Sequence, residues 1–267
     1  MLKEINAVQY LEGLPKTSCE VLTREEALQI RINEKSYTIT MRTPGNDDIL
    51  AAGLLFSEGI INQPDDILEI HETPTPGEDF TLAVDVQIKE AVLANQNIFN
   101  RAIASSASCG VCGKTDICDL VVPVKLNTTP DKLEIGRIPQ MLEKMRALQE
   151  TFEKTGGSHA AALLTIGGGV LGVREDIGRH NAVDKVIGEL FLQGRLHLAE
   201  IMLISGRVSY EIVAKCSRAK ISFLLAVSAP SSLAVDFCDR SGITLIGFCR
   251  DNRATVYTHS ENIQQSV

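Results

Sequence analysis

Three short apolar runs in the C-terminal half of the chain constrain its fold more than any other feature. The runs "IMLIS", "ISFLLAVS" and "ITLIGFC" begin at Ile201, Ile221 and Ile243, and each has the length of a buried strand. Helical stretches around 212–219 and 233–238 separate them. Strands that alternate with helices along a chain are typical of an α/β layer with parallel neighbouring strands. We therefore expect an α/β layer here.

The region before these runs adds further strands and two helices to the expected layer. The strings "HAAALLTI" and "GVLGVRED" flank three glycines at 167–169 and predict buried strands around a glycine turn. Apolar residues recur at helical spacing over 138–152 and over 182–191, and Pro139 suits a first helical turn. We expect one amphipathic helix over each of these two ranges.

The first hundred residues predict a smaller, mostly β part with one helix. Residues 28–42 alternate apolar and polar side chains on both sides of 33–35, which is typical of a β-hairpin. The string "GNDDILAAGLLFSEG" predicts a helix of about three turns, started by the side chain of Asn46 or Asp47 and stopped at Gly59. The strings "DILEIHET" and "FTLAVDVQI" return to strand period around the turn-rich "PTPGED".

Length and composition indicate a globular protein and restrict its partners. A chain of 267 residues that is 44% hydrophobic is long enough for one large domain or two unequal ones. A formal net charge of −8 argues against nucleic acid and membrane surfaces as partners, but it is compatible with a local basic pocket for one phosphorylated ligand. No signal peptide or membrane span is evident, so we expect the cytoplasm. The seven scattered cysteines are expected to be reduced thiols.

The string "SCGVCGK" places the thiols Cys109 and Cys112 in a glycine-rich setting, and three uses of such a pair are known. A structural metal site would need about two more ligands at suitable spacing. The chain has no second Cys-x-x-Cys and no His-x3-5-His, and Cys118 is the only other cysteine nearby. A zinc deaminase would need His-x-Glu together with Pro-Cys-x-x-Cys, whereas this chain offers His159-Ala160-Ala161 and a serine before Cys109. The sequence therefore disfavours a metal at this pair.

Redox cycling and sulfur carriage are the other two uses. Dithiol oxidoreductases usually carry Cys-x-x-Cys near the start of a βαβ unit, whereas here about a hundred β-rich residues precede it. A sulfur carrier needs a reachable thiolate on a flexible segment, and the small residues around Cys109, with Lys114 close in sequence, satisfy that need. The residues alone permit both uses and do not select between them.

Several long strings, in this order and spacing, resemble the FdhD family of sulfur-carrier proteins that formate dehydrogenase activity requires. They are "GNDDILAAGLLFSEG" from Gly45, "SCGVCGK", "REDIGRHNAVDK" from Arg174, "SGRVSYEIVAK" from Ser205 and "SAPSSLAV" from Ser228. The resemblance covers nearly the whole chain. It implies an α/β fold with a cytidine-deaminase-like three-layer core, here without the zinc and the catalytic glutamate pattern. The expected divisions are a β-rich part with one helix (1–103), a mobile Cys-x-x-Cys loop (104–115) and a deaminase-like α/β domain (116–267).

The resemblance also implies a function, that of a sulfurtransferase. A cysteine desulfurase would load persulfide sulfur onto Cys109, and the protein would pass it to the molybdenum or tungsten pterin cofactor of formate dehydrogenase, bis-molybdopterin guanine dinucleotide. Cys112 matches the second cysteine, which assists transfer or expels sulfur by forming a disulfide. A guanine nucleotide would mimic the ligand, and the family implies a homodimer without a structural metal. A dithiol oxidoreductase and a cofactor-binding chaperone are the alternative functions.

Two further groups of residues are expected to bind the cofactor. The first matches the family's cofactor-binding segment and comprises Phe248, Cys249, Arg250, Asp251, Asn252 and Arg253. Arg250 and Arg253 suit pyrophosphate because guanidinium groups form forked hydrogen bonds, although a solvated turn between two strands would look the same. The second comprises Gly206 and Arg207, which follow an apolar strand, and His180.

The string "EDIGRHNAVDK" admits two interpretations. Asp176 is placed to cap a helix, and the charges beyond it would ordinarily form a surface network. The competing hypothesis is that Arg179 and His180 face the ligand cleft, where helix amides favour anions. His159 is expected to pack in a buried strand or contact backbone rather than to act in catalysis.

Overall fold

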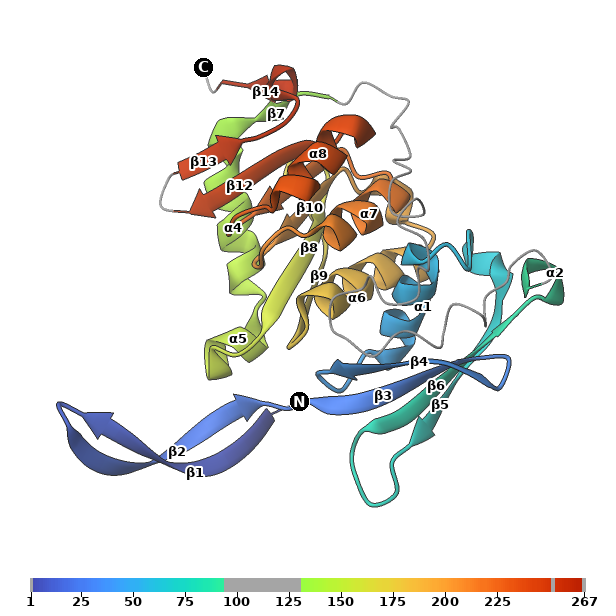
Figure 1. The fold of residues 1–267 in the computed structure, drawn as a ribbon, viewed down its shortest axis with the longest axis vertical. Helices are drawn as coiled ribbons and strands as arrows, with labels where there is room; N and C mark the ends of the chain where they lie inside the picture. The colour runs from blue at the N-terminus through green and yellow to red at the C-terminus, as the bar shows by residue number, and fades with distance from the viewer. Residues whose placement is uncertain (1, 94–130, 251–252, 266–267) are drawn as a thin grey trace.

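The computed structural model describes residues 2–93, 131–250 and 253–265, and Figure 1 shows their arrangement. The predicted thiol loop at 104–115, with the boundaries assigned to it, lies outside these residues. The protein is a mixed α/β structure whose largest element is a six-stranded sheet. Within the described residues, no helix combines the length and apolar character needed to cross a membrane.

The six-stranded sheet has the strand order β13-β12-β11-β10-β8-β9. Its strands are β8 (His159–Leu164), β9 (Val170–Asp176), β10 (Ile201–Ile204), β11 (Phe223–Ala226), β12 (Thr244–Arg250) and β13 (Arg253–Val256). Strands β10, β11 and β12 are parallel, as the apolar runs predict, whereas β8, β9 and β13 are antiparallel to their neighbours. The predicted α/β layer is thus confirmed, with antiparallel strands added at both sides.

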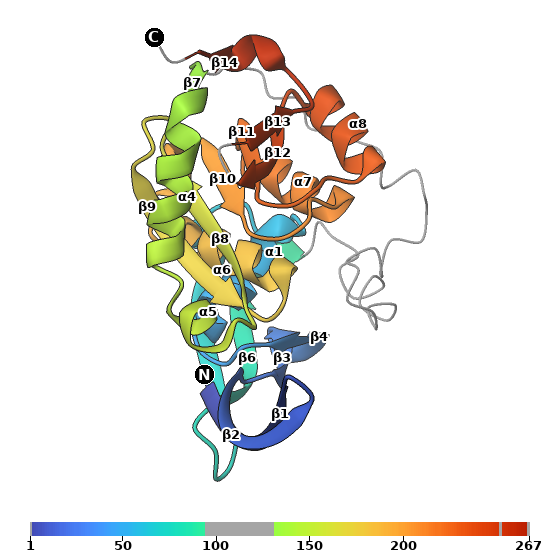
Figure 2. The same cartoon turned by 90° about the vertical axis from the view of Figure 1, so that its left-hand side faces the viewer.

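Helices cover both faces of this sheet and make three layers (Figure 2). They are α4 (Ile138–Ala147), α6 (Arg179–Leu192), α7 (Tyr210–Arg218) and α8 (Ser232–Ser241). Met141 and Met145 of α4 pack on one face with Ala162 of β8, while the helices α6, α7 and α8 pack on the other face with Leu163. The alternation along β8 sends successive side chains into the two apolar clusters.

The helix predicted over 138–152 is two helices, because the chain leaves helical geometry at Gln149. The first is α4, and the second is the short α5 (Glu150–Thr155). The carboxylate of Glu175 accepts hydrogen bonds from the backbone N–H groups of Thr151 and Phe152, both at 2.8 Å. A carboxylate that satisfies the free amides of a new helix start favours a break at this point.

The N-terminal part contains a four-stranded sheet of order β4-β3-β6-β5. Its elements are β3 (Glu26–Ile32), β4 (Lys35–Arg42), α1 (Asp47–Ser57), β5 (Ile67–Pro74), β6 (Thr81–Ile88) and α2 (Glu90–Leu93). The predicted hairpin is confirmed as β3 and β4, joined at Asn33 and Glu34, which both have positive φ. Helix α1 lies between this sheet and α6, which connects the two parts of the molecule (Figure 1).

The start of α1 differs from its prediction. The side chain of Asn46 accepts no capping hydrogen bond, and the residue itself has a φ of 57°. The carboxylate of Asp47 instead accepts two hydrogen bonds from the buried guanidinium of Arg42, at 2.8 and 2.9 Å. The predicted stop at Gly59 is confirmed, since this glycine has positive φ and its N–H bonds to the carbonyl of Phe56.

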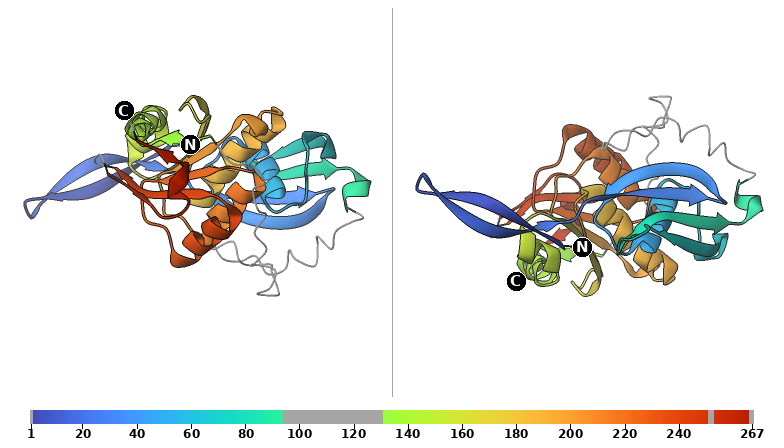
Figure 3. Two further views of the ribbon diagram at one scale, coloured as in Figure 1. Left: turned by 90° about the horizontal axis from the view of Figure 1, so that it is seen from above. Right: turned by 90° about the horizontal axis from the view of Figure 1, so that it is seen from below.

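A long hairpin of β1 (Leu2–Leu11) and β2 (Leu14–Thr23), which the sequence analysis does not predict, projects from the body of the molecule (Figure 3). It touches the body at α5, where the hydroxyls of Thr23 and Thr155 lie 2.7 Å apart. Seven of its large apolar side chains are exposed, namely Leu2, Ile5, Val8, Tyr10, Leu11, Leu14 and Leu22. Such a surface is typical of an interaction site.

The remaining elements are short. They are the parallel pair β7 (Leu133–Glu134) and β14 (Ile263–Gln264), and the 3-10 helices Pro64–Asp66, Ile135–Arg137, Leu196–Leu198 and Ser260–Asn262.

Candidate functional site

The predicted binding residues that the structure describes lie along one edge of the six-stranded sheet. Residues 205–209 follow β10, residues 227–231 follow β11, and Phe248 and Arg250 lie in the last part of β12. These are the carboxyl ends of three neighbouring parallel strands. Ligands of open α/β sheets bind in the crevice at this edge.

The antiparallel strands bring further residues to the same edge. His159, the first residue of β8, pairs with Asp176, the last residue of β9. Because β8 is antiparallel to β10, its first residue lies near the end of β10, beside Ser205. Helix α6 begins just after β9, which places His180 there too. The structure thus brings His180 to the edge that carries Gly206 and Arg207.

Backbone hydrogen bonds join the three loops of this edge. The N–H of Val208 donates to the carbonyl of Ala229 at 3.1 Å, and the N–H of Ser231 donates back to Val208 at 2.9 Å. The N–H of Phe248 donates to the carbonyl of Ser228 at 3.1 Å. The ends of β10, β11 and β12 therefore form one connected platform.

Phe248 lies at an irregularity in β12. Its φ is 52°, and the pairing of β12 with β13 shifts register between Gly247 and Arg250. Bulges of this kind are frequent beside binding sites, where they redirect a side chain. The guanidinium of Arg253 lies 5.0 Å from the centre of the Phe248 ring, within cation–π distance.

Arg250 and Arg253 face each other across the ends of β12 and β13. Both are exposed, and within the residues described neither forms an ion pair. The segment is the turn between two strands that the alternative interpretation expects, so cofactor binding by these arginines stays a prediction. Asp251 and Asn252 of the same segment lie outside the described residues.

The side chain of Cys249 points away from solvent. It is fully buried in the apolar cluster beneath α4, and its Sγ lies 3.6 Å from the carbonyl oxygen of Ile246, to which it donates. Burial raises the pKa of this thiol to about 11. A ligand at this position would therefore contact the backbone of Cys249 and not its sulfur.

The imidazole of His180 already has polar partners. Its Nε2 lies 2.8 Å from a carboxylate oxygen of Glu211 and 3.3 Å from the hydroxyl of Ser209. Arg207, by contrast, is exposed and has no ion-pair partner in the described parts of the chain. An anion at this edge would meet Arg207 directly, whereas at His180 it would compete with Glu211. No local motif singles out Ser209 and Glu211, although their place after a parallel strand points to this edge.

His159 is half-buried beside the same loop. Its Nδ1 lies 3.5 Å from the hydroxyl oxygen of Ser205, which accepts a hydrogen bond from the N–H of Ala160 at 2.9 Å. Burial lowers the pKa of His159, and the positive charges of Arg179, His180 and Arg207 lower it further, while Asp176 acts against them. His159 thus belongs to the candidate site and not only to the packing of β8.

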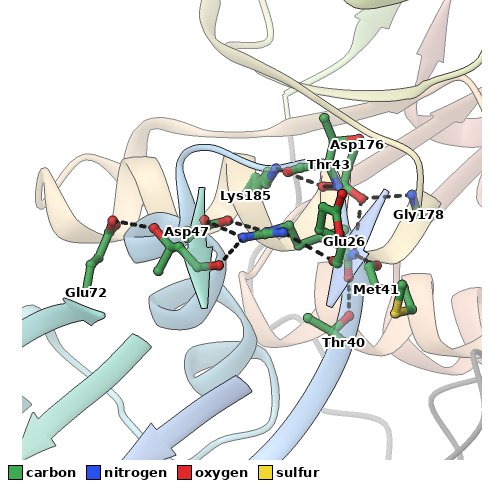
Figure 4. A network of polar contacts seen from close by, with 12 residues as sticks. Glu26, Thr40, Met41, Thr43, Asp47, Glu72, Asp176, Gly178 and Lys185 are labelled. Atoms are coloured by element: carbon green, nitrogen blue, oxygen red, sulfur yellow. Dashed lines mark hydrogen bonds and ion pairs between the residues drawn. The ribbon is translucent and has the colours of Figure 1, made fainter. Parts of the chain in front are cut away.

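Asp176 does not cap α6 and is not part of a surface network. It is fully buried, and its Oδ2 accepts from the N–H of Thr43 at 3.1 Å and from Nζ of Lys185 at 2.8 Å. Its Oδ1 accepts from the N–H of Gly178 and the side-chain amide of Asn181. Figure 4 shows this network, in which α6 is tied to the end of β4. The network positions the start of α6, and with it His180.

Other charges of the same string are buried too. Asp184 accepts from Nζ of Lys215 at 2.7 Å and from the hydroxyl of Ser57 at 2.8 Å. Lys185 also donates to the carbonyl of Thr43. Most charged residues of "EDIGRHNAVDK" therefore hold helices together, and Arg179 and His180 are left at the sheet edge.

The predicted sulfur-handling residues Cys109 and Cys112 lie outside the described residues. Of the four cysteines that the structure describes, Cys216, Cys238 and Cys249 are buried and Cys19 is exposed. Burial raises the pKa of Cys216 to about 12 and raises that of Cys238 as well. A thiol with so high a pKa is a poor nucleophile near neutral pH because the thiolate is the reactive form.

The described residues hold no group of three or more histidine, cysteine or acidic side chains arranged to bind a metal ion. In the described part of the chain, the candidate site therefore consists of arginines, histidines and backbone amides. Such groups suit an anion.

Comparison with known proteins identifies the family. The model of the FdhD/NarQ family matches residues 23–264, which is most of the chain. The chain belongs to the FdhD/NarQ family. Among its relatives, a protein of Streptomyces avermitilis named Sulfur carrier protein FdhD is 40% identical, over 96% of this chain and 93% of that protein. A protein of the same name from Sulfolobus acidocaldarius is 37% identical, over 98% of each.

A solved structure shares the fold. It is described as a putative formate dehydrogenase accessory protein from Desulfotalea psychrophila, and it matches with a TM-score of 0.78 at 23% sequence identity. The match covers 98% of this chain and 99% of that chain. The β-rich N-terminal part and the six-stranded layer thus occur together in another protein over nearly their whole length.

Proposed function

We propose that this member of the FdhD/NarQ family is a cytoplasmic sulfur carrier that serves formate dehydrogenase. The observation that carries the proposal is the match, at about 40% identity and over nearly the full length, to proteins named Sulfur carrier protein FdhD. In this proposal the sulfur comes from a cysteine desulfurase. It goes to the bis-guanylated molybdenum or tungsten pterin that formate dehydrogenase uses, which is here a substrate.

Cys109 is the proposed acceptor. Its thiolate attacks the terminal sulfur of the desulfurase persulfide, the donor's S–S bond breaks, and the donor cysteine leaves as a thiolate. Three of the described cysteines are buried, so a donor persulfide cannot reach their thiols. The step is redox-neutral, because one persulfide is converted into another and no external oxidant or reductant takes part.

Cys112 is proposed to release the sulfur. If its thiolate attacks the sulfur atom of Cys109, the terminal sulfur leaves as hydrosulfide and the two cysteines form a disulfide. The two cysteine thiols supply the two electrons that reduce the sulfur to hydrosulfide. A cellular thiol reductant then reduces the disulfide back to the two thiols. Direct transfer from Cys109 to the metal, assisted by Cys112, is the other form of this step.

The edge of the six-stranded sheet is the proposed binding site for the guanylated pterin. Arg207, Arg250 and Arg253 are exposed there, in a protein whose overall charge is −8. An anionic ligand gains little from the net field of such a protein, so local cations must bind it. Gly206 lets backbone approach the ligand, and Phe248 offers a ring for stacking.

A maturation assay tests the proposal. The wild type, Cys109→Ala and Cys112→Ala are each expressed in cells that lack their own copy of the gene, and formate dehydrogenase activity is measured. Cys19→Ser, which changes the exposed thiol of the projecting hairpin, is the matched control. We expect activity with the wild type and the control and none with Cys109→Ala.

The other outcomes separate the alternatives. Full activity with Cys109→Ala, together with intact binding of GDP, would identify a cofactor chaperone and refute the carrier. Activity with Cys112→Ala would exclude an obligatory dithiol cycle and, with it, a dithiol oxidoreductase. A homodimer is part of the proposal, and light scattering of the purified protein tests it.

A further inference from the structure

The hairpin of β1 and β2 has little in its own structure to hold it. It projects from the body, and the described element that it packs against most is α5 (Figure 3). A two-stranded hairpin alone is at best marginally stable in water, because neither of its faces is covered. The FdhD/NarQ family model matches from residue 23, so the hairpin precedes the part that this model describes. A hairpin of this length needs a further surface to pack against.

The pairing register divides the hairpin into two faces. Paired residues lie on the same face, and successive pairs alternate between the two faces. Thr23 lies on the face that meets the body, through its hydroxyl contact with Thr155 of α5. The opposite face, which we call the Ser18 face, is turned away from that contact. It consists of Lys3, Ile5, Ala7, Gln9, Leu11, Leu14, Lys16, Ser18, Glu20 and Leu22.

The β2 half of the Ser18 face has a nearly symmetric pattern about its centre. From the base of the hairpin to its tip, the side chains are apolar, acidic, small, basic and apolar, namely Leu22, Glu20, Ser18, Lys16 and Leu14. A second copy that stacks on this face in the opposite direction has its two-fold axis at Ser18. Leu22 then meets the partner's Leu14, and Glu20 meets the partner's Lys16. A closed two-fold contact uses one surface patch on both copies in this way.

Charge favours this antiparallel arrangement. Within the described residues neither Lys16 nor Glu20 forms an ion pair, and the two lie about 14 Å apart along β2, too far to pair with each other. The antiparallel stack forms two Glu20–Lys16 pairs, one on each side of the axis. A parallel stack would place β1 over β2, so that Glu20 and Lys16 would face Ile5 and Gln9. Opposite charges meet in the antiparallel stack alone.

The ends and the centre of the face suit the same contact. Leu22 at the base is 43% exposed and Leu14 at the tip is 73% exposed, so the contact removes apolar surface from water at both ends. At the centre, Ala7 and Ser18 are small and let two hairpins approach closely. The Oγ of Ser18 is shielded from solvent, yet it has no hydrogen-bond partner in the described residues, which is rare for a buried hydroxyl. Rotation about χ1 brings it to the partner's Ser18 across the axis.

We propose that the Ser18 face is a homodimer interface, on which a second copy of this chain stacks in the opposite direction about a two-fold axis at Ser18. The inference rests on the homodimer of the proposed function, to which it adds the contact surface, and it requires nothing of the sulfur transfer. An interface of standard size uses about 20–30 residues on each side, and this face offers fewer. The dimer is therefore weak, with a Kd of about 10 µM.

Sedimentation equilibrium from about 1 to about 200 µM protein measures this Kd. The wild type should change from mostly monomer to mostly dimer over that range. Lys16→Glu and Glu20→Lys each turn both ion pairs into like-charge contacts, so each should weaken the dimer at least about tenfold. Glu4→Lys is the matched control, because it makes the same change of charge on the opposite face. Its Kd should stay within about twofold of that of the wild type.

A mixture of the two variants gives the sharper test. In a mixed dimer, the two acidic side chains of one copy face two basic side chains of the other, so both ion pairs form again. An equimolar mixture of Lys16→Glu and Glu20→Lys should dimerise with a Kd within about threefold of the wild-type value, although neither variant does so alone. Lys16→Asp and Glu20→Arg repeat the experiment if circular dichroism shows that either first variant is unfolded.

Three results would overturn the inference. They are a wild type that stays monomeric over the whole range, single variants that dimerise like the wild type, and a mixture of folded variants that stays monomeric. The second result would refute this interface and keep the homodimer, which then forms through another surface.

The sulfur carrier is tested separately. Persulfide formation on Cys109 is measured on the wild type and on Lys16→Glu at a concentration where the variant is monomeric. Formation of the persulfide keeps the carrier, whatever the dimer test shows. A wild type that dimerises through the Ser18 face but never forms the persulfide refutes the carrier and keeps the interface.

Discussion

Gly53 of α1 and Gly188 of α6 face each other where the two helices cross. A Cβ atom on Gly53 would lie 1.9 Å from the carbonyl oxygen of Asp184, and one on Gly188 would lie 1.9 Å from the carbonyl oxygen of Ile49. Both distances are far below contact distance, and both partners are backbone atoms that cannot rotate away. The crossing therefore requires glycine on both helices, and it couples the N-terminal sheet to the helix that begins at the candidate site.

The first prediction concerns this crossing. Gly188→Ala should lower the free energy of unfolding by about 3 kcal/mol, because the added methyl forces the helix backbones apart. Chemical denaturation followed by circular dichroism measures the change. Gly167→Ala is the control, since its Cβ would meet its nearest atom only at 4.0 Å and its φ is not in the left-handed region. The free energy of unfolding of Gly167→Ala should equal or slightly exceed that of the wild type. Equal stabilities of the two variants would refute the close crossing.

The second prediction concerns the buried pair of Asp176 and Lys185. Asp176→Asn leaves the ammonium group of Lys185 buried without its counter-charge and should lower the free energy of unfolding by about 3–5 kcal/mol. Glu134→Gln, which breaks the exposed pair with Arg137, should change it by less than about 0.5 kcal/mol. Denaturation of both variants gives the comparison. If Asp176→Asn lowered the free energy of unfolding no more than the control does, the network in Figure 4 would not hold α6 in place.

The third prediction is a pH dependence from His159. In the folded protein its pKa lies below the ordinary value of 6.5, first because of burial and next because of Arg179. As the pH falls through 6.5, the unfolded chain takes up a proton that the folded chain resists, so stability declines; above 6.5 this effect is absent. His159→Gln should show a flatter decline in stability on the acid side. A titration by NMR that placed the pKa of His159 above 6.5 would contradict the prediction.

The fourth prediction separates the cysteines by reactivity. In native protein near neutral pH, iodoacetamide should alkylate Cys19 and leave Cys216, Cys238 and Cys249 unmodified, because these three are buried and their thiols have raised pKa values. All four should react after denaturation. Peptide mass spectrometry reads out each site, and rapid alkylation of Cys216 in native protein would show that the packing of α7 and α8 is looser than described.

Local sequence pattern predicted the elements whose signals lie within a few residues. The apolar runs at 201–204, 223–226 and 244–250 are strands, and the strand ends correctly indicated one edge for Gly206 and Arg207. The same rule did not reveal that the thiol of Cys249 is buried, because a register shift at a bulge changes which face a side chain takes.

Features that depend on distant residues were not predictable in this way. The hydrogen bond between Thr43 and Asp176 joins residues 133 positions apart. No pattern in the sequence near Asp176 therefore predicts that its carboxylate is buried and binds several groups. The break at Gln149 depends on the carboxylate of Glu175, and the need for Gly53 and Gly188 depends on a helix crossing. Hairpin β1–β2 escaped prediction because neither of its faces is consistently apolar.

The central claim is that Cys109 accepts a sulfur atom. The most direct measurement is intact-protein and peptide mass spectrometry after incubation with a cysteine desulfurase and cysteine. The account predicts an added mass of about 32 Da, one sulfur atom, on the peptide that contains Cys109. The addition should disappear in Cys109→Ala, on treatment with a thiol reductant, and when the desulfurase is omitted, and it should persist in Cys19→Ser. No addition to the wild type, or an addition that survives in Cys109→Ala, would contradict the account.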